Sequence, residues 1–155
     1  MSSTEPVANG AYEISSDAAR LDVTAIHAYL TRSYWSPGIP LAIVEQALRH
    51  SLCFGVYEAA SGAQVGLARV VTDYATFAYL CDVYVLEEHR GHGIGKRLMR
   101  EVMAHPALAG ARRVILATRD AHGLYRKSGF ADVGQSRTLM EIVKPDVYAD
   151  GAGRA

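Results

Sequence analysis

A short loop with three glycines carries the clearest chemical signal in the chain. It reads RGHGIGK, residues 90–96, with Arg90 and Lys96 as cations at its ends and an apolar run before it. A helix pattern follows, and the first N–H groups of a helix have no intrahelical partner and carry partial positive charge. Because glycines also let a ligand approach the backbone closely, the loop suits a pyrophosphate. The alternative is a glycine-rich connection that binds no ligand.

The spacing within this loop excludes two common nucleotide-binding motifs. A P-loop has the pattern G-x-x-x-x-G-K-S/T. Here Gly95 and Lys96 are followed by Arg97, and Arg90 occupies the position of the first glycine. The dinucleotide fingerprint requires G-x-G-x-x-G, whereas this loop has G-x-G-x-G.

The elements that position the loop follow from hydrophobic periodicity and turn signals. Apolar residues at helical spacing predict helices at 22–33, 40–50 and 93–105, and a short one at 121–129. Apolar runs bounded by turns predict strands at 11–16, 52–60, 65–72, 76–86 and 112–118. Two further segments, 130–134 and 138–144, look like closing strands.

The order of these elements defines the expected fold class. Short turns join the strands between residues 52 and 86, which predicts two antiparallel hairpins. The helix at 93–105 links the strands at 77–86 and 112–118, and such a crossover makes them parallel neighbours. We therefore expect an α+β, or mixed α/β, domain with helices on both faces of the sheet.

Composition limits the partners and the location. The chain has 155 residues with 16 basic and 16 acidic side chains, which predicts one domain over 1–155 with no general affinity for nucleic acid or membrane. Cys53 and Cys81 lie in apolar runs, which indicates free thiols in a reducing cytoplasm and no metal site. The first ten residues lack a signal-peptide pattern, and no apolar run has membrane-spanning length. Residues 1–10 and about 148–155 are expected to be flexible.

Two segments match one known pattern in the right order. The first is Arg90-x-x-Gly93-x-Gly95 after a strand ending in VYV. The second is ATRDAHGLYRKSGF, residues 117–130, with a Leu-Tyr pair, a basic stretch and Gly-Phe. Together they resemble the GNAT superfamily of acyl-CoA-dependent N-acetyltransferases. The resemblance runs from about residue 54 to residue 130, and the first two helices agree with the family in pattern only.

The resemblance implies a splayed pair of parallel strands with acetyl-CoA, a co-substrate, in the gap. Backbone groups of Val83, Tyr84 and Val85 would pair with the pantetheine arm, and an N–H near Val85 would act as an oxyanion donor. Thr118, where many members carry asparagine, is also assigned to the cofactor site. The pyrophosphate would lie on Arg90, Gly91, His92, Gly93, Ile94, Gly95 and Lys96.

The resemblance also implies a chemical role for Tyr125 beside the cofactor. In the family an amine attacks the thioester carbonyl, and coenzyme A leaves as a thiolate. A thiol has a pKa near roughly 8.5 and a phenol near roughly 10. Tyr125 is therefore expected to give a proton, or a hydrogen bond, to the leaving sulfur. The alternative is a helix tyrosine that anchors the core.

Asp82 is the expected acceptor of the proton that the amine must lose. An alkyl amine with a pKa near roughly 10.4 is mostly protonated at neutral pH, so a base or a water chain is needed. Strand alternation in YLCDVYV places Leu80, Asp82 and Tyr84 on one face. An acid within an apolar central strand needs a reason. The alternative is a structural carboxylate.

The acceptor amine is expected to bind at loops near the first two helices and a hairpin, as in the family. Tyr34 and Trp35 lie between the two predicted helices, and Asp73 and Tyr74 lie between two predicted strands. Aromatic walls with a carboxylate suit an aliphatic or aromatic amine. The alternative for Trp35 is simple packing of the inter-helix loop.

These residues lead to one expected function and two alternatives. The expected function is transfer of an acetyl group from acetyl-CoA to a primary amine of a small molecule, by direct attack in a ternary complex. A protein acetyltransferase acting on a lysine or an N-terminus would need an open peptide groove, and no extra segment is seen to build one. An acyl-CoA-binding module without catalysis would have no need of Tyr125. A homodimer is left open.

Overall fold

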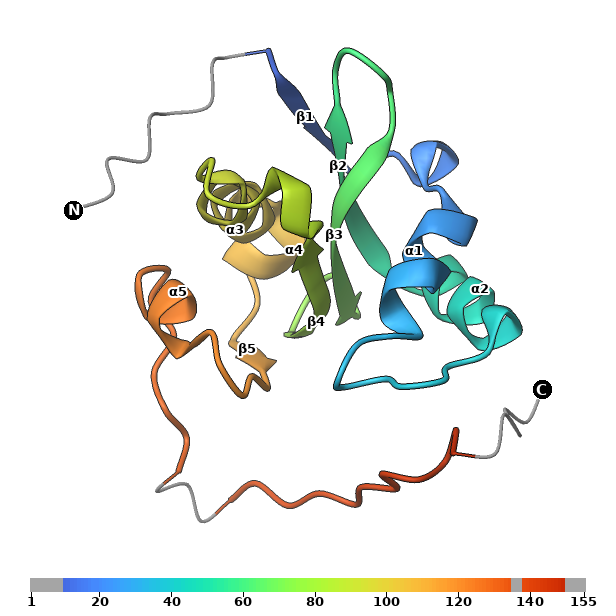
Figure 1. Ribbon diagram of the computed structural model, residues 1–155. Coiled ribbons are helices and arrows are strands. Elements are labelled where there is room, and N and C mark those ends of the chain that lie inside the picture. Colours follow the sequence, from blue (N-terminus) through green and yellow to red (C-terminus); the bar gives the residue numbers. More distant parts are fainter. Residues whose placement is uncertain (1–9, 135–137, 150–155) are drawn as a thin grey trace.

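A five-stranded mixed sheet forms the centre of the molecule (Figure 1). The computed structural model describes residues 10–134 and 138–149. The strands lie side by side in chain order, so that each one pairs with the next. They are β1 (Tyr12–Ser15), β2 (Leu52–Glu58), β3 (Gln64–Thr72), β4 (Phe77–Val85) and β5 (Arg113–Leu116).

The connections set the direction of each strand. β1 to β4 pair in antiparallel fashion, as short turns between β2, β3 and β4 require. β4 and β5 are parallel, with Phe77 opposite Arg113 and Leu80 opposite Leu116, because a helix carries the chain back between them. The predicted mixed α+β fold, with antiparallel hairpins and one parallel pair, is confirmed.

Helices cover both faces of the sheet, as predicted (Figure 1). Two helices lie on one face, namely α1 (Val23–Leu30) and α2 (Leu41–Arg49). The other face carries α3 (Ile94–Ala104), α4 (Pro106–Ala109) and α5 (His122–Arg126). Two 3-10 helices, η1 (Ala18–Arg20) and η2 (Glu87–His89), lie in connections.

Local signals explain where these helices begin and end. The Asp22 carboxylate accepts from the Ala25 N–H and caps α1. Pro40 precedes α2, where a fixed φ suits a helix start. Pro106 ends α3 and begins α4, because the residue before a proline avoids the helical region. Gly93 caps α3 with a left-handed φ of +75°.

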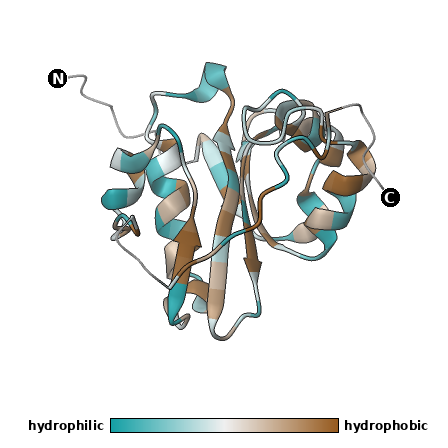
Figure 2. Cartoon of the chain, turned by 90° about the horizontal axis from the view of Figure 1, so that it is seen from below, coloured by the Kyte–Doolittle hydropathy of each residue, from teal (hydrophilic) through white to brown (hydrophobic). Residues whose placement is uncertain are grey.

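Each face of the sheet has its own hydrophobic core. One lies under α3, α4 and α5 and includes Leu98 and Leu80. The other lies under α1 and α2 and includes Leu30 and Tyr84. Figure 2 shows the sheet standing between these two groups of helices. β4 therefore has a hydrophobic core on each of its faces, and this packing holds the end of β4 in place.

The two predicted closing strands are not strands in the structure. Residues 130–134 and 138–144 pair with no strand of the described chain. Their apolar pattern motivated the prediction, but a strand forms only where a neighbouring edge supplies hydrogen bonds. The segment from 138 onward instead passes beneath the ends of the strands toward α1 and α2 (Figures 1 and 2), leaving Met140 97 % and Ile142 91 % exposed.

The expectation of flexible ends falls mostly on residues 1–9 and 150–155, which lie outside the described residues. Tyr148 does not lie free, because it packs against the core under α1 and α2. Within 10–134 and 138–149, no helix has the length and apolar character to cross a membrane.

Candidate active site

β4 is longer than its parallel neighbour, and this leaves a gap in the sheet. The last pair is Leu80 opposite Leu116, whereas β4 continues to Val85. The Leu86 N–H donates to the Val65 carbonyl in β3 at 2.8 Å. Because successive residues point their N–H and C=O groups to opposite edges, those of Val85 point into the gap. A backbone edge therefore faces the gap where the pantetheine arm was predicted.

Asp82 marks a bulge in β4, and the bulge overturns the predicted alternation. Its φ is +50°, in the left-handed region that residues other than glycine rarely adopt. The register between β3 and β4 shifts at this point. As a result Leu80 packs under α3 and Tyr84 packs under α1, on opposite faces of the sheet. The sequence prediction placed both on one face, because strict alternation along a strand does not allow for the extra residue of a bulge.

The glycine loop leads from the end of β4 into α3. Gly91 and Gly93 have φ values of +83° and +75°, and a Cβ added to either would meet only open space. Such φ values favour glycine over any other residue. Gly93 caps α3 without a side-chain hydrogen bond, and buried Ile94 anchors the first turn. The positive end of α3 is thus presented next to an open surface.

The two cations of the loop are placed differently. Arg90 donates through Nε to the Val85 carbonyl at 2.8 Å and through Nη2 to the Tyr29 hydroxyl at 3.1 Å. Lys96 and His92 are exposed near the start of α3. Arg90 therefore ties the loop to the end of β4, and Lys96 is available at its surface.

A pocket of about 500 Å³ lies beside the gap. Its walls are residues 79–83 of β4, the segment 116–121 after β5, the pair Tyr34 and Trp35, and Tyr125 of α5. This volume lies within the range of small-molecule sites. The pocket brings together six residues that the sequence singled out, namely Tyr34, Trp35, Asp82, Val83, Thr118 and Tyr125.

Tyr125 forms part of the pocket wall nearest α5. Its largely buried ring meets the Phe130 ring edge-on, with 5.9 Å between centroids. Burial raises the pKa of Tyr125 to about 12, so its hydroxyl keeps its proton at neutral pH. Thr118 accepts from the Ala121 N–H at 3.0 Å and so shapes the turn before α5.

Two aromatic residues of the loop between α1 and α2, Tyr34 and Trp35, form part of the pocket wall. The Tyr34 hydroxyl accepts from the Arg119 N–H at 3.2 Å, and its ring lies 3.8 Å from the Arg119 guanidinium. The same hydroxyl lies 3.5 Å from an Asp120 carboxylate oxygen. The Trp35 ring meets the Tyr34 ring edge-on at 5.0 Å. The loop thereby reaches the segment that follows β5.

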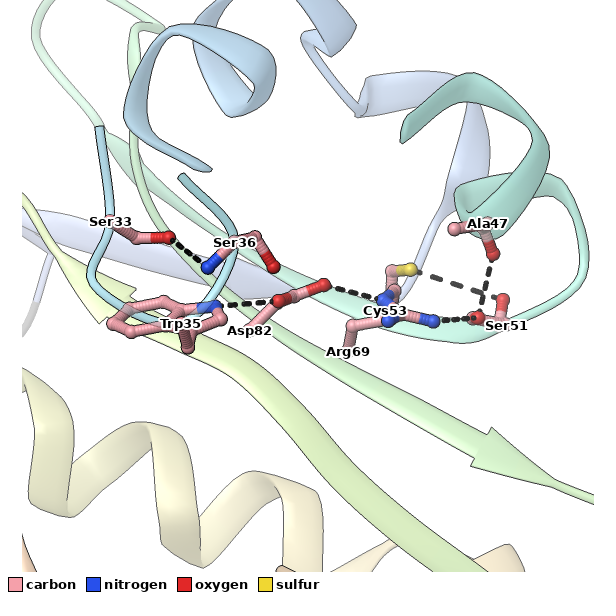
Figure 3. A network of polar contacts seen from close by, with 8 residues as sticks. All are labelled: Ser33, Trp35, Ser36, Ala47, Ser51, Cys53, Arg69 and Asp82. Atoms are coloured by element: carbon pink, nitrogen blue, oxygen red, sulfur yellow. Dashed lines mark hydrogen bonds and ion pairs between the residues drawn. The ribbon is translucent and has the colours of Figure 1, made fainter. Parts of the chain in front are cut away.

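The Asp82 carboxylate in β4 accepts hydrogen bonds from two side chains (Figure 3). Trp35 Nε1 donates to Oδ1 at 2.8 Å, and Arg69 Nε donates to Oδ2 at 2.7 Å. The Asp82 side chain is only 8 % exposed. Each carboxylate oxygen therefore already accepts a hydrogen bond from the protein, and the bulge is what aims the side chain at both donors.

Asp73 and Tyr74 lie in the turn between β3 and β4 and are not among the residues that line the pocket. Asp73 accepts from the Thr76 hydroxyl and from the backbone N–H groups of Thr76, Ala75 and Phe77. These hydrogen bonds hold the pKa of Asp73 well below its ordinary value. Tyr74 is exposed with a φ of +64°. The structure thus gives Asp73 a role in its own turn, and both residues lie outside the pocket that Tyr34 and Trp35 line.

Three residues of the site were missed by sequence reasoning. Arg69 lies in the apolar strand segment LARVV, so its charge was a signal of the same kind as that of Asp82. Arg119 and Asp120 follow β5 in a polar run. No sequence signal links them to Tyr34, because that contact exists only in the folded chain.

Comparison with known proteins gives the same result for sequence and for fold. A family model described as the acetyltransferase (GNAT) family matches residues 11–130. A Gibberella zeae protein named as a candidate acetyltransferase is 38 % identical over 140 residues, covering 77 % of this chain and 78 % of that protein. The chain therefore belongs to the GNAT acetyltransferase family, and the resemblance inferred from two motifs is confirmed.

Two solved structures extend the comparison. A candidate GNAT acetyltransferase from Xanthomonas campestris pv. campestris has a TM-score of 0.85 and 51 % identity, covering 89 % of this chain and 96 % of that one. A candidate acetyltransferase from Clostridium acetobutylicum, solved with acetyl-CoA, has a TM-score of 0.61 and 15 % identity, covering 85 % of this chain and 94 % of that one. The second likeness shows the fold alone. Membership in the family makes this protein an acyltransferase.

Proposed function

We propose that this protein transfers the acetyl group of acetyl-CoA to the primary amine of a small molecule, by direct attack in a ternary complex. One arrangement supports the proposal: β4 runs from the pocket that Tyr125 lines, along the gap beside β5, to the loop before α3. Val83 lines the pocket, and Arg90 links the loop to Val85. Donor and acceptor could therefore meet at the end of β4.

The residues present fit acetyl-CoA. Gly91 and Gly93 leave open space where a side chain would stand, and the first N–H groups of α3 favour an anion there. Exposed Lys96 adds a positive charge to the same place. Beyond Leu80 the edge of β4 has no strand beside it, so backbone groups such as the Val85 N–H can pair with an extended amide-containing arm, whereas the Val85 carbonyl accepts from Arg90. These features support the pyrophosphate and pantetheine sites that the family resemblance implies.

Acetyl-CoA supplies a thioester whose carbonyl carbon the amine attacks. The Val85 N–H points into the gap, and we assign it the stabilisation of negative charge on the carbonyl oxygen. Tyr125 holds its proton because burial raises its pKa to about 12. We assign it the donation of that proton, or of a hydrogen bond, to the departing sulfur.

The proton lost by the amine needs a separate acceptor. Asp82 lines the pocket, but Trp35 and Arg69 already donate to its two oxygens. We therefore assign Asp82 to the pocket wall and the proton to water in the pocket, in place of the direct base role expected from sequence. Asp82 is then a structural carboxylate, the alternative to a base that the sequence left open.

The variant Asp82→Asn separates the two roles. A structural Asp82 predicts a lower rate at every pH between 7 and 9.5, with a raised KM for the amine. A base predicts a loss at pH 7 that is partly recovered as pH rises, because more of the amine is then neutral without help. The pH profiles of kcat and KM for the wild type and for Asp82→Asn distinguish the two roles. Partial recovery of the rate at high pH would identify Asp82 as the base.

The shape of the pocket favours a small acceptor over a peptide. Tyr34 bridges from the α1–α2 loop to Arg119 in the segment after β5, and we expect this contact to limit the length of any groove. Aromatic rings and the Asp120 carboxylate line this end, and both suit an ammonium or an alkyl chain. A small aliphatic or aromatic amine is therefore the acceptor that we propose.

A cytoplasmic location is part of the proposal. Cys53 and Cys81 are both free thiols. Burial raises the pKa of Cys53 to about 11 and that of Cys81 to about 12, so neither is a reactive thiolate at neutral pH. Unpaired, unreactive thiols fit a reducing compartment.

A thiol-release assay with acetyl-CoA and a panel of amines tests the proposal. We expect release with at least one small amine and only background release with a lysine peptide. Release with peptides alone would favour a protein acetyltransferase. Acetyl-CoA that raises the melting temperature without any release across the panel would favour a binding module.

A further inference from the structure

We infer that Arg69 is a positioning residue which, through Asp82, holds Trp35 in place as a wall of the pocket and thereby sets the affinity for the acceptor. The inference rests on the proposed function for its acceptor, and on the contacts in Figure 3 for its geometry. Arg69 is not among the residues that line the pocket.

Arg69 is fixed between two rigid elements. Its side chain is 18 % exposed on β3, on the face covered by α1 and α2. Nη1 donates to the Ser51 hydroxyl at 3.1 Å, and that hydroxyl donates to the Ala47 carbonyl in α2 at 2.6 Å. Nε donates to Asp82 at 2.7 Å. A guanidinium held in this way can fix the direction of its partner carboxylate, because its N–H groups form a planar fork.

Asp82 depends on Arg69 for a buried counter-charge. The carboxylate is nearly enclosed, and a buried charge without a partner is strongly destabilising. Its residue also adopts the left-handed φ of the bulge, a conformation that persists only when its surroundings over-determine it. The ion pair therefore fixes both the bulge and the oxygen that faces Trp35.

Trp35 depends in turn on Asp82. The indole is 37 % exposed and belongs to the loop between α1 and α2. Its Nε1 donates to Asp82 at 2.8 Å, and its ring has tilted contact with Tyr29 at 6.1 Å. The hydrogen bond to a charged oxygen is the directional contact that ties the indole to the sheet. Loss of Arg69 should free the indole while the glycine loop stays intact.

The indole itself provides the readout, because Trp35 is the one tryptophan in the chain. In Arg69→Met, we expect its emission to shift to longer wavelength and its quenching by acrylamide to rise, measured without any substrate. Arg69→Lys keeps the positive charge but not the planar fork of N–H groups. Its emission and quenching should lie between those of the wild type and Arg69→Met. Ser51→Ala should give a smaller shift in the same direction. Arg20→Met is the matched control, because Arg20 also pairs with a carboxylate on the sheet, that of Glu13, yet lies away from Trp35.

Steady-state kinetics then tests the link to the acceptor. In Arg69→Met, we expect the KM for the amine to rise about tenfold, as for the loss of one charge-assisted hydrogen bond, and the KM for acetyl-CoA to stay within about twofold. A purely structural role would raise both together or lower only the melting temperature. If Arg69→Met does not fold, Arg69→Lys and Ser51→Ala carry both measurements.

Unchanged emission and quenching in folded Arg69→Lys and Ser51→Ala would overturn the inference, as would equal increases in both KM values. The fluorescence result is independent of catalysis. If the emission shifts as expected but no amine supports thiol release, the proposed function fails while the coupling of Arg69 to Trp35 stands.

Discussion

At the scale of single residues, the role proposed for Tyr125 on α5 can be tested directly by removing its hydroxyl. Tyr125→Phe keeps the ring and its contact with Phe130 but removes the hydroxyl. We expect turnover to fall on the order of 10²-fold, a typical contribution of a general acid. The affinity for acetyl-CoA, measured by titration, should change little.

Tyr74→Phe is the matched control for this loss, because Tyr74 is exposed in the β3–β4 turn. It should leave turnover unchanged. A Tyr125→Phe enzyme that is folded and fully active would reduce Tyr125 to a packing residue.

The same residue predicts a pH profile. Burial raises the pKa of Tyr125 to about 12, so the hydroxyl remains protonated at every pH below about 11. A tyrosine with an ordinary pKa of roughly 10 would lose its proton, and the rate would fall, on approaching pH 10. We therefore expect kcat to keep rising up to pH 10 as more of the amine becomes neutral, with no fall caused by Tyr125. A decline with a midpoint below pH 10, in a protein still folded by circular dichroism, would contradict this assignment.

At the scale of elements, the junction of β4, the glycine loop and α3 should carry the binding of acetyl-CoA. Gly93→Glu adds a side chain and a negative charge where the pyrophosphate is proposed to lie. Acetyl-CoA should raise the melting temperature of the wild type and fail to raise that of the variant. Differential scanning fluorimetry measures both.

Gly62→Glu supplies the control for backbone strain. Gly62 lies in the β2–β3 turn with the same φ of +75°, and a Cβ there also meets open space. Both variants therefore carry similar strain and the same new charge, and Gly62→Glu should keep the full response to acetyl-CoA. A folded Gly93→Glu protein that keeps the full response would place the anion site elsewhere. An equal loss in both variants would show that the loss comes from backbone strain or general charge and not from the loop.

At the scale of the whole molecule, the helices and sheet enclose two cores, and the exposed apolar residues Met140 and Ile142 belong to neither. Leu98 is 0 % exposed under α3, and Leu98→Ala should cost about 2–5 kcal/mol of unfolding free energy. Met140 is 97 % exposed, and Met140→Ala should stay within about 0.5 kcal/mol. Urea denaturation measures both. A loss of several kcal/mol in Met140→Ala would show that this segment packs as the strand that its pattern suggested.

Local patterns in the sequence determined most of the elements and the identity of the loop. Hydrophobic period and turn residues located all five strands of the sheet and the helices α1, α2, α3 and α5. Gly91 and Gly93, which marked the loop in the sequence, have left-handed φ values in the structure. These features are local, because helix starts, turns and left-handed glycines depend on residues a few positions apart.

The tertiary structure decided what depends on distant partners. Alternation misplaced Asp82 relative to Leu80 and Tyr84, because a bulge depends on how β4 registers against β3. The hydrogen bonds that Asp73 accepts within its own turn also appear only in the folded chain. Residues 138–144 carry a strand pattern but belong to no strand of the described chain, since only an adjacent edge turns such a pattern into a strand. Tyr34 and Arg119 are 85 positions apart, so no local spacing could reveal their contact. The pairing of Arg69 with Asp82 depends on the shifted register between β3 and β4.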